Sequence, residues 1–288
     1  MERSHLGAWL ALPVVGAVTA LCIAPLAILL IYSFFQVDFV FILKDPTLKN
    51  YARLASSDTY RNLITKAFVS GGSIAVITAV IGHPIAYHIA KRVTHYKSAL
   101  LILLLVPLYT GDLVRIFAWR VLLGAEGVLN SFLIWAGVIT EPFSALLFSS
   151  LATHIVLTYN FLPFMVLGLW LAYESLDDRL LEAASDLGAG RVSSFRRITF
   201  PMTLPGLIAG GMMVFVMVIG DYLTPQLVGG VSGITIISAI NDLFGTAFDW
   251  PLGSAIAWTM LAILCIFFTL AALGISRSTW GRALMGGE

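Results

Sequence analysis

The sequence has 288 residues, of which 59% are hydrophobic and only 11% are charged, and its formal net charge at pH 7 is +1. Soluble globular domains carry about 25% charged residues, so this composition excludes a soluble domain and indicates an integral membrane protein. The small net charge leaves no basic face of the kind that binds nucleic acid. Cys22 and Cys265 lie inside apolar runs and are interpreted as small buried hydrophobic residues, which disfavours a disulfide or a metal site.

The apolar runs predict an all-α membrane protein with six transmembrane helices, because each run is long enough to cross a hydrocarbon layer of about 30 Å. The first run is longer than the apolar core of a signal peptide and is expected to stay in the protein as a span. The whole chain, 1–288, is expected to form one transmembrane domain. In chain order, the expected spans are residues 7–35, 63–90, 99–123, 143–173, 202–223 and 251–275.

Two of the connections carry helical patterns of their own. An amphipathic helix is expected near residues 48–54, between the first and second spans. Residues 128–138, between the third and fourth spans, are apolar enough to lie on the membrane surface.

Basic residues near the ends of spans predict the orientation, because cytoplasmic loops are enriched in lysine and arginine. The rule favours an N-terminus and a C-terminus in the cytoplasm, which also places the connection 174–201 there. On that side lie Arg3, Lys91, Arg92, Lys97, Arg179, Arg191, Arg196, Arg197, Arg277 and Arg282.

Residues 174–201, between the fourth and fifth spans, form a polar block that must lie in water. Ser175 followed by Asp178 predicts a capping box at the start of a helix of about three turns, and Gly188 supplies the left-handed residue that ends it. Small residues in its apolar stripe are expected to let another surface approach closely. The stripe, at helical spacing, consists of Leu180, Ala183, Ala184 and Leu187.

The block also carries a long composite pattern: Glu182-Ala183-Ala184, three residues, Gly188, nine residues, Ile198, one residue, then Phe200-Pro201. This pattern resembles the EAA loop of binding-protein-dependent ABC importer permeases, except that Phe200 stands where the family usually has leucine. The bland alternative is an ordinary solvated loop helix. The resemblance implies a coupling helix that docks in a groove of a cytoplasmic ATPase. The residues implied in coupling are Leu180, Glu182, Ala183, Ala184, Leu187, Gly188, Ile198 and Pro201.

Shorter segments extend the resemblance over nearly the whole chain and are similar to the spermidine/putrescine branch of these permeases. They are Tyr32-Ser33-Phe34-Phe35, Val106-Pro107-Leu108-Tyr109-Thr110, Leu113-Val114-Arg115-Ile116, Leu162-Pro163-Phe164-Met165, Asp221-Tyr222-Leu223-Thr224-Pro225 and Gly229-Gly230. Because relatives on this branch carry other small cationic or zwitterionic solutes, an amino-acid-like or opine-like solute stays open beside a polyamine.

The resemblance further implies a type I importer subunit in a bacterial inner membrane. Its partners would be an ABC ATPase dimer, a second homologous permease, an extracytoplasmic solute-binding protein and membrane lipid, with no nucleic acid. ATP and Mg would be bound by the partner ATPase, and no cofactor by this chain.

Charged residues inside or at the edge of the membrane are costly in lipid and are therefore functional candidates. Helical spacing predicts that Tyr109, Asp112 and Trp119 share a face, and a carboxylate between aromatic rings suits an ammonium group. Two bland alternatives stay open: Asp112 pairs with Arg115, and Asp221 with Tyr222 forms an interfacial anchor. The candidate solute path consists of Tyr109, Asp112, Trp119, Asp221 and Tyr222.

Polar residues also occur within the fourth span. His154 and Asn160, near Pro163, are expected to satisfy carbonyl groups that the proline kink frees, although they are also candidates for lining a path.

The sequence contains no Gly-x-x-x-x-Gly-Lys-Ser/Thr, His-Glu-x-x-His, Cys-x-x-Cys or Gly-x-Ser-x-Gly pattern. It is therefore not expected to be an enzyme, and ATP hydrolysis is left to a partner. A channel or secondary transporter is the remaining alternative. Such a protein needs ionisable relays or broken helices at the bilayer midplane, whereas the charges here cluster at the outer ends of the spans.

Overall fold

The computed structural model describes residues 2–39, 41–143 and 146–277, with side chains described for 16–39, 41–143 and 146–274. The chain divides into two compact units, residues 1–62 with 239–273 and residues 63–238 with 274–288. Of the basic residues that predict the orientation, Arg282 and the side chains of Arg3 and Arg277 lie outside the described parts.

The first unit contains helices from both ends of the sequence. Asn50 is buried, and its Nδ2 donates to the carbonyl oxygens of Ser33 and Phe35 at 3.0 and 2.7 Å, which ties α2 to the end of α1. On α13, Trp258 Nε1 donates to the carbonyl oxygen of Leu26 on α1 at 3.2 Å. The elements are α1 (Glu2–Ser33), the antiparallel strands β1 (Gln36–Asp38) and β2 (Phe41–Leu43), α2 (Lys49–Ser56) and most of α13 (Trp250–Arg277).

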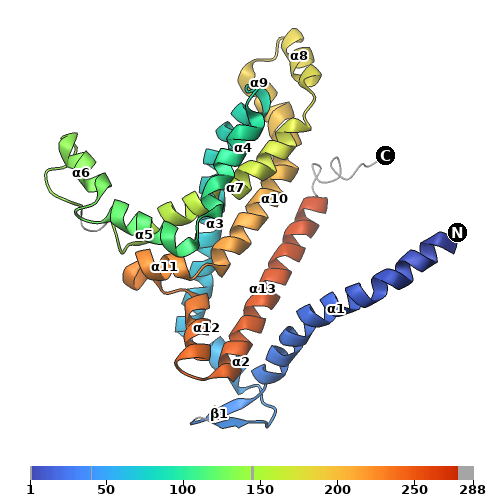
Figure 1. Ribbon diagram of the computed structural model, residues 1–288, viewed down its shortest axis with the longest axis vertical. Helices are drawn as coiled ribbons and strands as arrows, with labels where there is room; N and C mark the ends of the chain where they lie inside the picture. The colour runs from blue at the N-terminus through green and yellow to red at the C-terminus, as the bar shows by residue number, and fades with distance from the viewer. Residues whose placement is uncertain (1, 40, 144–145, 278–288) are drawn as a thin grey trace. The chain divides into compact units, whose positions relative to one another are not determined.

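The remaining elements (Figure 1) belong wholly or partly to the second unit, since residues 58–62 of α3 and 239–245 of α12 are assigned to the first unit. They are α3 (Asp58–Lys91), α4 (Lys97–Leu105), η1 (Val106–Tyr109), α5 (Asp112–Leu123), α6 (Val128–Trp135), α7 (Ser150–Glu174), α8 (Asp178–Asp186), α9 (Arg191–Ser194), η2 (Phe195–Thr199), α10 (Phe200–Gly220), α11 (Leu223–Val228), η3 (Gly230–Gly233) and α12 (Ile236–Gly245).

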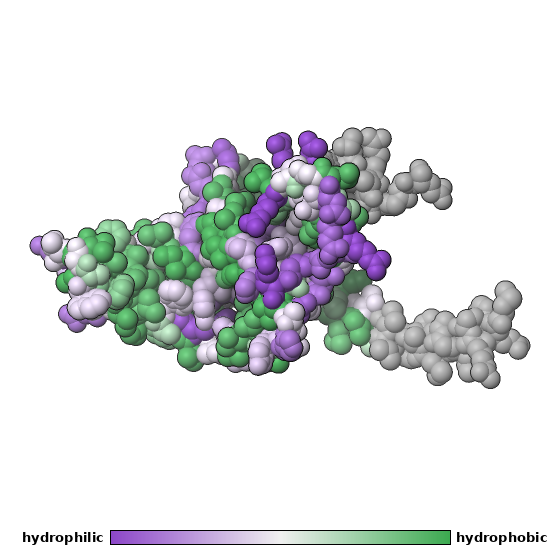
Figure 2. All heavy atoms as spheres, turned by 90° about the horizontal axis from the view of Figure 1, so that it is seen from above, coloured by the Kyte–Doolittle hydropathy of each residue, from purple (hydrophilic) through white to green (hydrophobic). Residues whose placement is uncertain are grey.

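Six segments among the described residues are long and apolar enough to cross a membrane, which confirms the predicted fold class. Apolar side chains remain exposed on the spans, and Val69, Val76 and Val80 on α3 are each more than 60% exposed. Figure 2, seen from above, shows apolar side chains at the surface among hydrophilic ones. The six segments are Gly16–Ser33, Asp58–Lys91, Asp112–Trp135, Ser150–Glu174, Arg191–Gly220 and Trp250–Gly274.

The third predicted span, 99–123, is not one continuous helix. Pro107 lies in the first turn of the short 3-10 helix η1, Thr110 is extended, and α5 begins only at Asp112. Proline has no N–H to continue an α-helical ladder, which accounts for the break. The apolar segment that is long enough to span begins after this break and includes α5 and α6.

Close packing of α7 against α10 forms the centre of the second unit. A Cβ atom on Gly168 would lie 2.8 Å from the carbonyl oxygen of Gly206, and one on Gly206 would lie 2.6 Å from Cβ of Ala172. Only glycine fits where two helix backbones approach this closely. Around the contact, α3, α7 and α10 bury a core that includes Ile74, Leu157, Met165, Leu169, Tyr173 and Val214.

Candidate functional site

The predicted coupling loop folds as a short helix with both ends capped. Asp177 begins α8, and its Oδ1 accepts the N–H of Arg179 at 3.0 Å. The predicted capping box on Ser175 is wrong, because the Ser175 hydroxyl donates to the carbonyl oxygen of Ala172 at 2.9 Å and so closes α7 instead.

The C-terminal end of α8 follows the prediction. Gly188 has φ +79°, and its N–H donates to the carbonyl oxygen of Ser185 at 2.9 Å. The N–H of Ala189 donates to the carbonyl oxygen of Ala184, also at 2.9 Å. This pair of bonds is the Schellman arrangement, and it requires the left-handed residue that glycine adopts without strain.

The apolar stripe of α8 divides between two surroundings. Leu187 is 88% exposed and Leu180 44% exposed, whereas Ala184 is 9% exposed. Leu181, which lies beside Ala184 on the helix, packs against the core of the second unit. The side chains of Ala184 and Leu181 face the chain's own interior, so the surface that lies close to this small residue belongs to the chain itself. Ala183 and Glu182 remain exposed beside Leu180 and Leu187.

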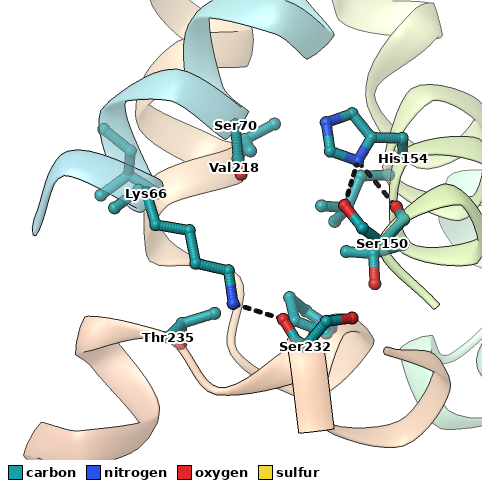
Figure 3. Close-up of a pocket in the computed structure, with 12 residues that line it drawn as sticks. Lys66, Ser70, Ser150, His154, Val218, Ser232 and Thr235 are labelled. Atoms are coloured by element: carbon teal, nitrogen blue, oxygen red, sulfur yellow. Dashed lines mark hydrogen bonds between the residues drawn. The ribbon is translucent and has the colours of Figure 1, made fainter. Parts of the chain in front are cut away.

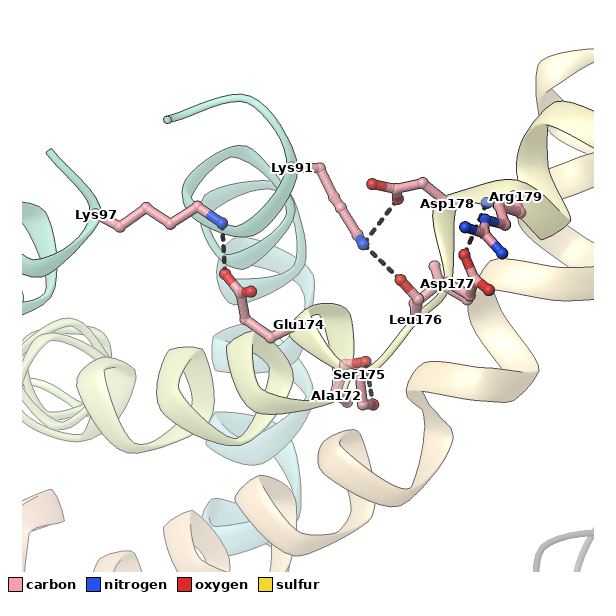
Figure 4. A network of polar contacts seen from close by, with 9 residues as sticks. All are labelled: Lys91, Lys97, Ala172, Glu174, Ser175, Leu176, Asp177, Asp178 and Arg179. Carbon is pink, nitrogen blue, oxygen red and sulfur yellow. Dashed lines mark hydrogen bonds and ion pairs between the residues drawn. The ribbon is translucent and has the colours of Figure 1, made fainter. Parts of the chain in front are cut away.

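Two lysines hold the start of the loop (Figure 4). Lys91, at the end of α3, donates from Nζ to the carbonyl oxygen of Leu176 at 2.7 Å and pairs with Asp178 at 2.8 Å. Lys97, at the start of α4, pairs with Glu174 at 2.7 Å. The Lys91 side chain is only 12% exposed, so its contacts are partly shielded from water.

Beyond α8, the chain enters the fifth span through one turn of π-helix, η2. Ile198 packs against the core, and Pro201 is buried in α10 directly after the π-helical turn. The rings of Phe195 and Phe200 lie 6.1 Å apart, and each lies 6.1–6.3 Å from the His83 ring of α3. These contacts connect the loop to the span.

A second candidate site is an open cavity of about 400 Å³ between η1, α5, α7 and the junction of α10 with α11. Asp112, Asp221 and Tyr222 of the predicted path line it, together with Arg115 and Asn160. Figure 1 shows α5 and α11 well away from α8 within the second unit. The cavity and the coupling helix therefore lie in different parts of that unit.

Both carboxylates in the cavity have intramolecular partners. Arg115 Nη2 donates to Asp112 Oδ1. Asp221, which directly follows the last residue of α10 and lies outside the spans, accepts the Thr224 N–H at 3.0 Å and the Thr224 hydroxyl at 2.7 Å. Burial raises the pKa of Asp221, the bonds from Thr224 lower it, and the nearby Asp112 charge raises it.

Two predicted path residues lie elsewhere. Tyr109 is 89% exposed and belongs to η1, so the prediction that it shares a helical face with Asp112 is wrong; the break after Pro107 separates the two. The Trp119 ring packs edge-on against Tyr159 at 5.3 Å and is not among the residues that line the cavity.

Asn160 lines the cavity, whereas the sequence predicts mainly that it satisfies carbonyl groups freed by the kink at Pro163. It is 6% exposed, and among the described residues its Oδ1 has no hydrogen-bond partner. The signal was present as a polar amide in an apolar span, but spacing alone did not distinguish a cavity wall from a proline kink.

A smaller pocket of about 30 Å³ lies beside Lys66 (Figure 3). Lys66 Nζ donates to the carbonyl oxygens of Ser232 and Ile234. His154 contacts the Ser150 carbonyl oxygen at 2.8 Å and the Ser73 hydroxyl at 3.0 Å. The Lys66 bonds fasten the segment after α11 to α3, and the contact between His154 and Ser73 joins α7 to α3. The pocket has room only for water.

No protein-family model matches the chain. It is similar to the spermidine/putrescine transport system permease protein PotB of Haemophilus influenzae, with 37% identity over 223 residues and 77% of each chain covered. It is also similar to PotB of Escherichia coli strain K12, with 38% identity over 219 residues, 76% of this chain and 78% of that protein.

Among solved structures, the chain is similar to a bacterial ABC transporter involved in the import of the acidic polysaccharide alginate, with a TM-score of 0.76. The match covers 96% of this chain and 97% of that chain at 16% identity, so it shows a shared fold.

The two PotB relatives exceed 30% identity over more than two thirds of both chains, and the structure supplies six apolar helices. The chain is thus a multi-pass inner-membrane protein and a non-catalytic subunit. It belongs to the family of ABC importer permeases.

Proposed function

We propose that this chain is one of two membrane-spanning subunits of an ATP-driven importer for a polyamine such as spermidine or putrescine. The whole chain, 1–288, acts as a single permease domain whose two ends lie in the cytoplasm. Its partners are an ABC ATPase dimer, a second homologous permease, an extracytoplasmic solute-binding protein and membrane lipid. ATP and Mg are bound by the ATPase. The similarity to the two PotB proteins supports this proposal.

The observation that carries the coupling role is the exposed apolar side of α8. Leu180 on α8 and Leu187 at its C-terminal end remain exposed, although the helix is capped at both ends and the residues before it are held by Lys91. An ordered helix with exposed leucines suits a groove on a partner protein. When ATP closes the ATPase dimer, the dimer moves α8, and the spans reorient around a path between the two permeases.

The ATPase contact can be tested by replacing Leu187 with Asp. We expect the variant to insert and fold normally and to lose most of its co-purifying ATPase, because a charge replaces an apolar contact. Val231→Asp is the control, since Val231 is 90% exposed on η3, far from the loop in sequence. Equal ATPase recovery for Leu187→Asp and Val231→Asp would contradict docking at α8.

The solute path passes, in this proposal, through the cavity at Asp112, Asp221 and Tyr222. Tyr109 lies on the neighbouring η1, and Trp119 supports α5 through Tyr159. Carboxylates replace part of the water around an ammonium group, and the Tyr222 ring adds cation–π attraction.

Uptake by the complete reconstituted importer tests this path. Asp112→Asn keeps the shape and removes the charge, and we expect putrescine uptake to fall about tenfold. Asp58→Asn is the matched control, because this carboxylate is 85% exposed and outside the cavity. Unchanged uptake by Asp112→Asn and by Asp221→Asn would rule out this cavity as the path.

A further inference from the structure

Arg115 makes an incomplete set of hydrogen bonds. Its side chain is only 11% exposed, and Nη2 donates to Asp112. Among the described residues, Nε and Nη1 are buried without a partner. A guanidinium has five N–H donors, and these two nitrogens carry three of them. A buried charged donor without an acceptor is costly, so a purely structural ion pair does not account for this arrangement.

The same cavity is rich in acceptors. The Asp112 side chain is 68% exposed despite its pairing with Arg115. The Asp221 carboxylate lines the cavity, as does Asn160, whose buried Oδ1 has no partner among the described residues. With both carboxylates ionised, the cavity's two carboxylates and one guanidinium sum to a net charge of about −1. Without the guanidinium the charge would be about −2, which matches the two ammonium groups of a linear diamine.

Resting on the proposed function, we infer that Arg115 is an internal counter-ion that holds the place of a solute ammonium at Asp112 and is displaced when a diamine enters the cavity. One ammonium of the diamine then pairs with Asp112. The other is received by Asp221 and the Asn160 amide oxygen. The displaced guanidinium reaches water and satisfies the donors that are unpartnered beside Asp112.

Displacement gives the cavity a means of selecting the solute by charge. A monoamine brings a single positive charge, which the cavity accommodates with Arg115 still at Asp112. A diamine brings two charges, and the second is neutralised only if the guanidinium leaves. Arg115 therefore competes with one end of a diamine and interferes little with a monoamine.

The test is direct binding of putrescine and butylamine to the purified complex in nanodiscs, without the solute-binding protein. Removing the competitor with Arg115→Gln should tighten putrescine binding about tenfold and change butylamine binding much less. Arg115→Lys keeps a competing cation and should bind like the parent. Arg120→Gln is the matched control, because this substitution also removes one positive charge from α5. The Arg120 guanidinium lies over the rings of Phe117 and Phe148 and does not line the cavity.

A double variant keeps the test usable if Arg115→Gln alone folds poorly. Asp112→Asn with Arg115→Gln removes the pair together and leaves about one negative charge at Asp221. We expect it to bind putrescine and butylamine with similar affinity. Markedly tighter binding of putrescine than of butylamine by the double variant would overturn the inference.

The inference and the proposed function fail in different ways. If Asp112→Asn weakens putrescine binding but Arg115→Gln does not tighten it, the counter-ion role is wrong and the path stands. If Arg115→Gln weakens binding of ornithine and leaves putrescine unchanged, Arg115 receives a carboxylate and the inference is also wrong. If neither Asp112→Asn nor Asp221→Asn affects any amine, the proposed path itself is wrong.

Discussion

At the scale of single residues, Gly188 is the position where one side chain decides the shape of the coupling loop. Its φ of +79° lies in the left-handed region, and space around it is open within 4 Å. The requirement for glycine is therefore conformational. A β-branched residue there costs about 1–2 kcal/mol, which is enough to unwind the last turn of a nine-residue helix.

Gly188→Val should therefore reduce the amount of ATPase that co-purifies with the complex, while membrane insertion stays normal. Gly190→Ala serves as the control, because Gly190 has φ −68° and nothing within 4 Å of its Cβ position. Association lost in both variants, or in neither, would contradict a specific role for the left-handed residue.

The sequence predicts residues well where a backbone conformation demands one residue type, as at Gly188. It predicts them less well where several polar residues compete for one task. Ser175, Asp177 and Asp178 are all plausible caps, and the end of α7 determines which of them is free to start α8. A stripe of four residues covers a wide arc of a short helix, so spacing alone does not show that Ala184 is at the edge that meets the core.

At the scale of elements, the backbone contact between α7 and α10 depends on two glycines. Gly206→Ala would place Cβ against the backbone of Gly168 and 2.6 Å from Cβ of Ala172. Because the backbone cannot move aside as a flexible side chain does, we expect the free energy of unfolding to fall by about 1–3 kcal/mol. A lower midpoint of thermal unfolding in detergent would show it.

Gly72→Ala is the control for this change, since Gly72 lies on α3 with nothing within 4 Å of its Cβ position. Helix propensity alone should make that variant about as stable as the parent, or more stable by up to about 1 kcal/mol. If Gly206→Ala is equally well tolerated, the helices are not held by a backbone contact.

The lysine contacts predict unequal effects on α8. Lys91→Ala removes a bond to the Leu176 carbonyl oxygen from a side chain that is 12% exposed, at a cost of roughly 1–3 kcal/mol. Lys97→Ala removes a pair whose side chains are both about a third exposed, worth about 0.2–1 kcal/mol. Hydrogen exchange of the α8 amides should accelerate more in Lys91→Ala than in Lys97→Ala, and the reverse order would contradict this ranking.

Hydropathy predicts most of the spans closely but not their interruptions. The second and sixth spans, predicted at 63–90 and 251–275, correspond to α3 and α13. The break at Pro107 and the π-helical turn at Phe195–Thr199 depend on how freed backbone groups are satisfied locally. Pro107 is the local sign of the first interruption, because proline cannot continue a helical hydrogen-bond ladder, whereas mean hydropathy does not register it.

At the scale of the whole molecule, orientation is the property that membrane labelling can decide. In a background without Cys22 and Cys265, a cysteine replacing Arg191 should react with an impermeant maleimide only from the cytoplasm, and one replacing Asp58 only from outside. Both positions are exposed. Asp249 is a poorer choice, because its side chain is 22% exposed and pairs with Arg53 at 3.4 Å. Reversed labelling at the two positions would overturn the predicted orientation.

The backbone contact between Gly168 and Gly206 restricts bending of α7 near its middle. Glu174, where the loop is held by Lys97, and Asn160, in the cavity wall, lie on this one helix about 21 Å apart. Between these two residues, α10 packs against α7 and makes it more rigid. If the proposed ATPase docks at α8, a displacement of the loop should tilt α7 as a whole rather than bend it locally, so that the loop and the cavity wall move together.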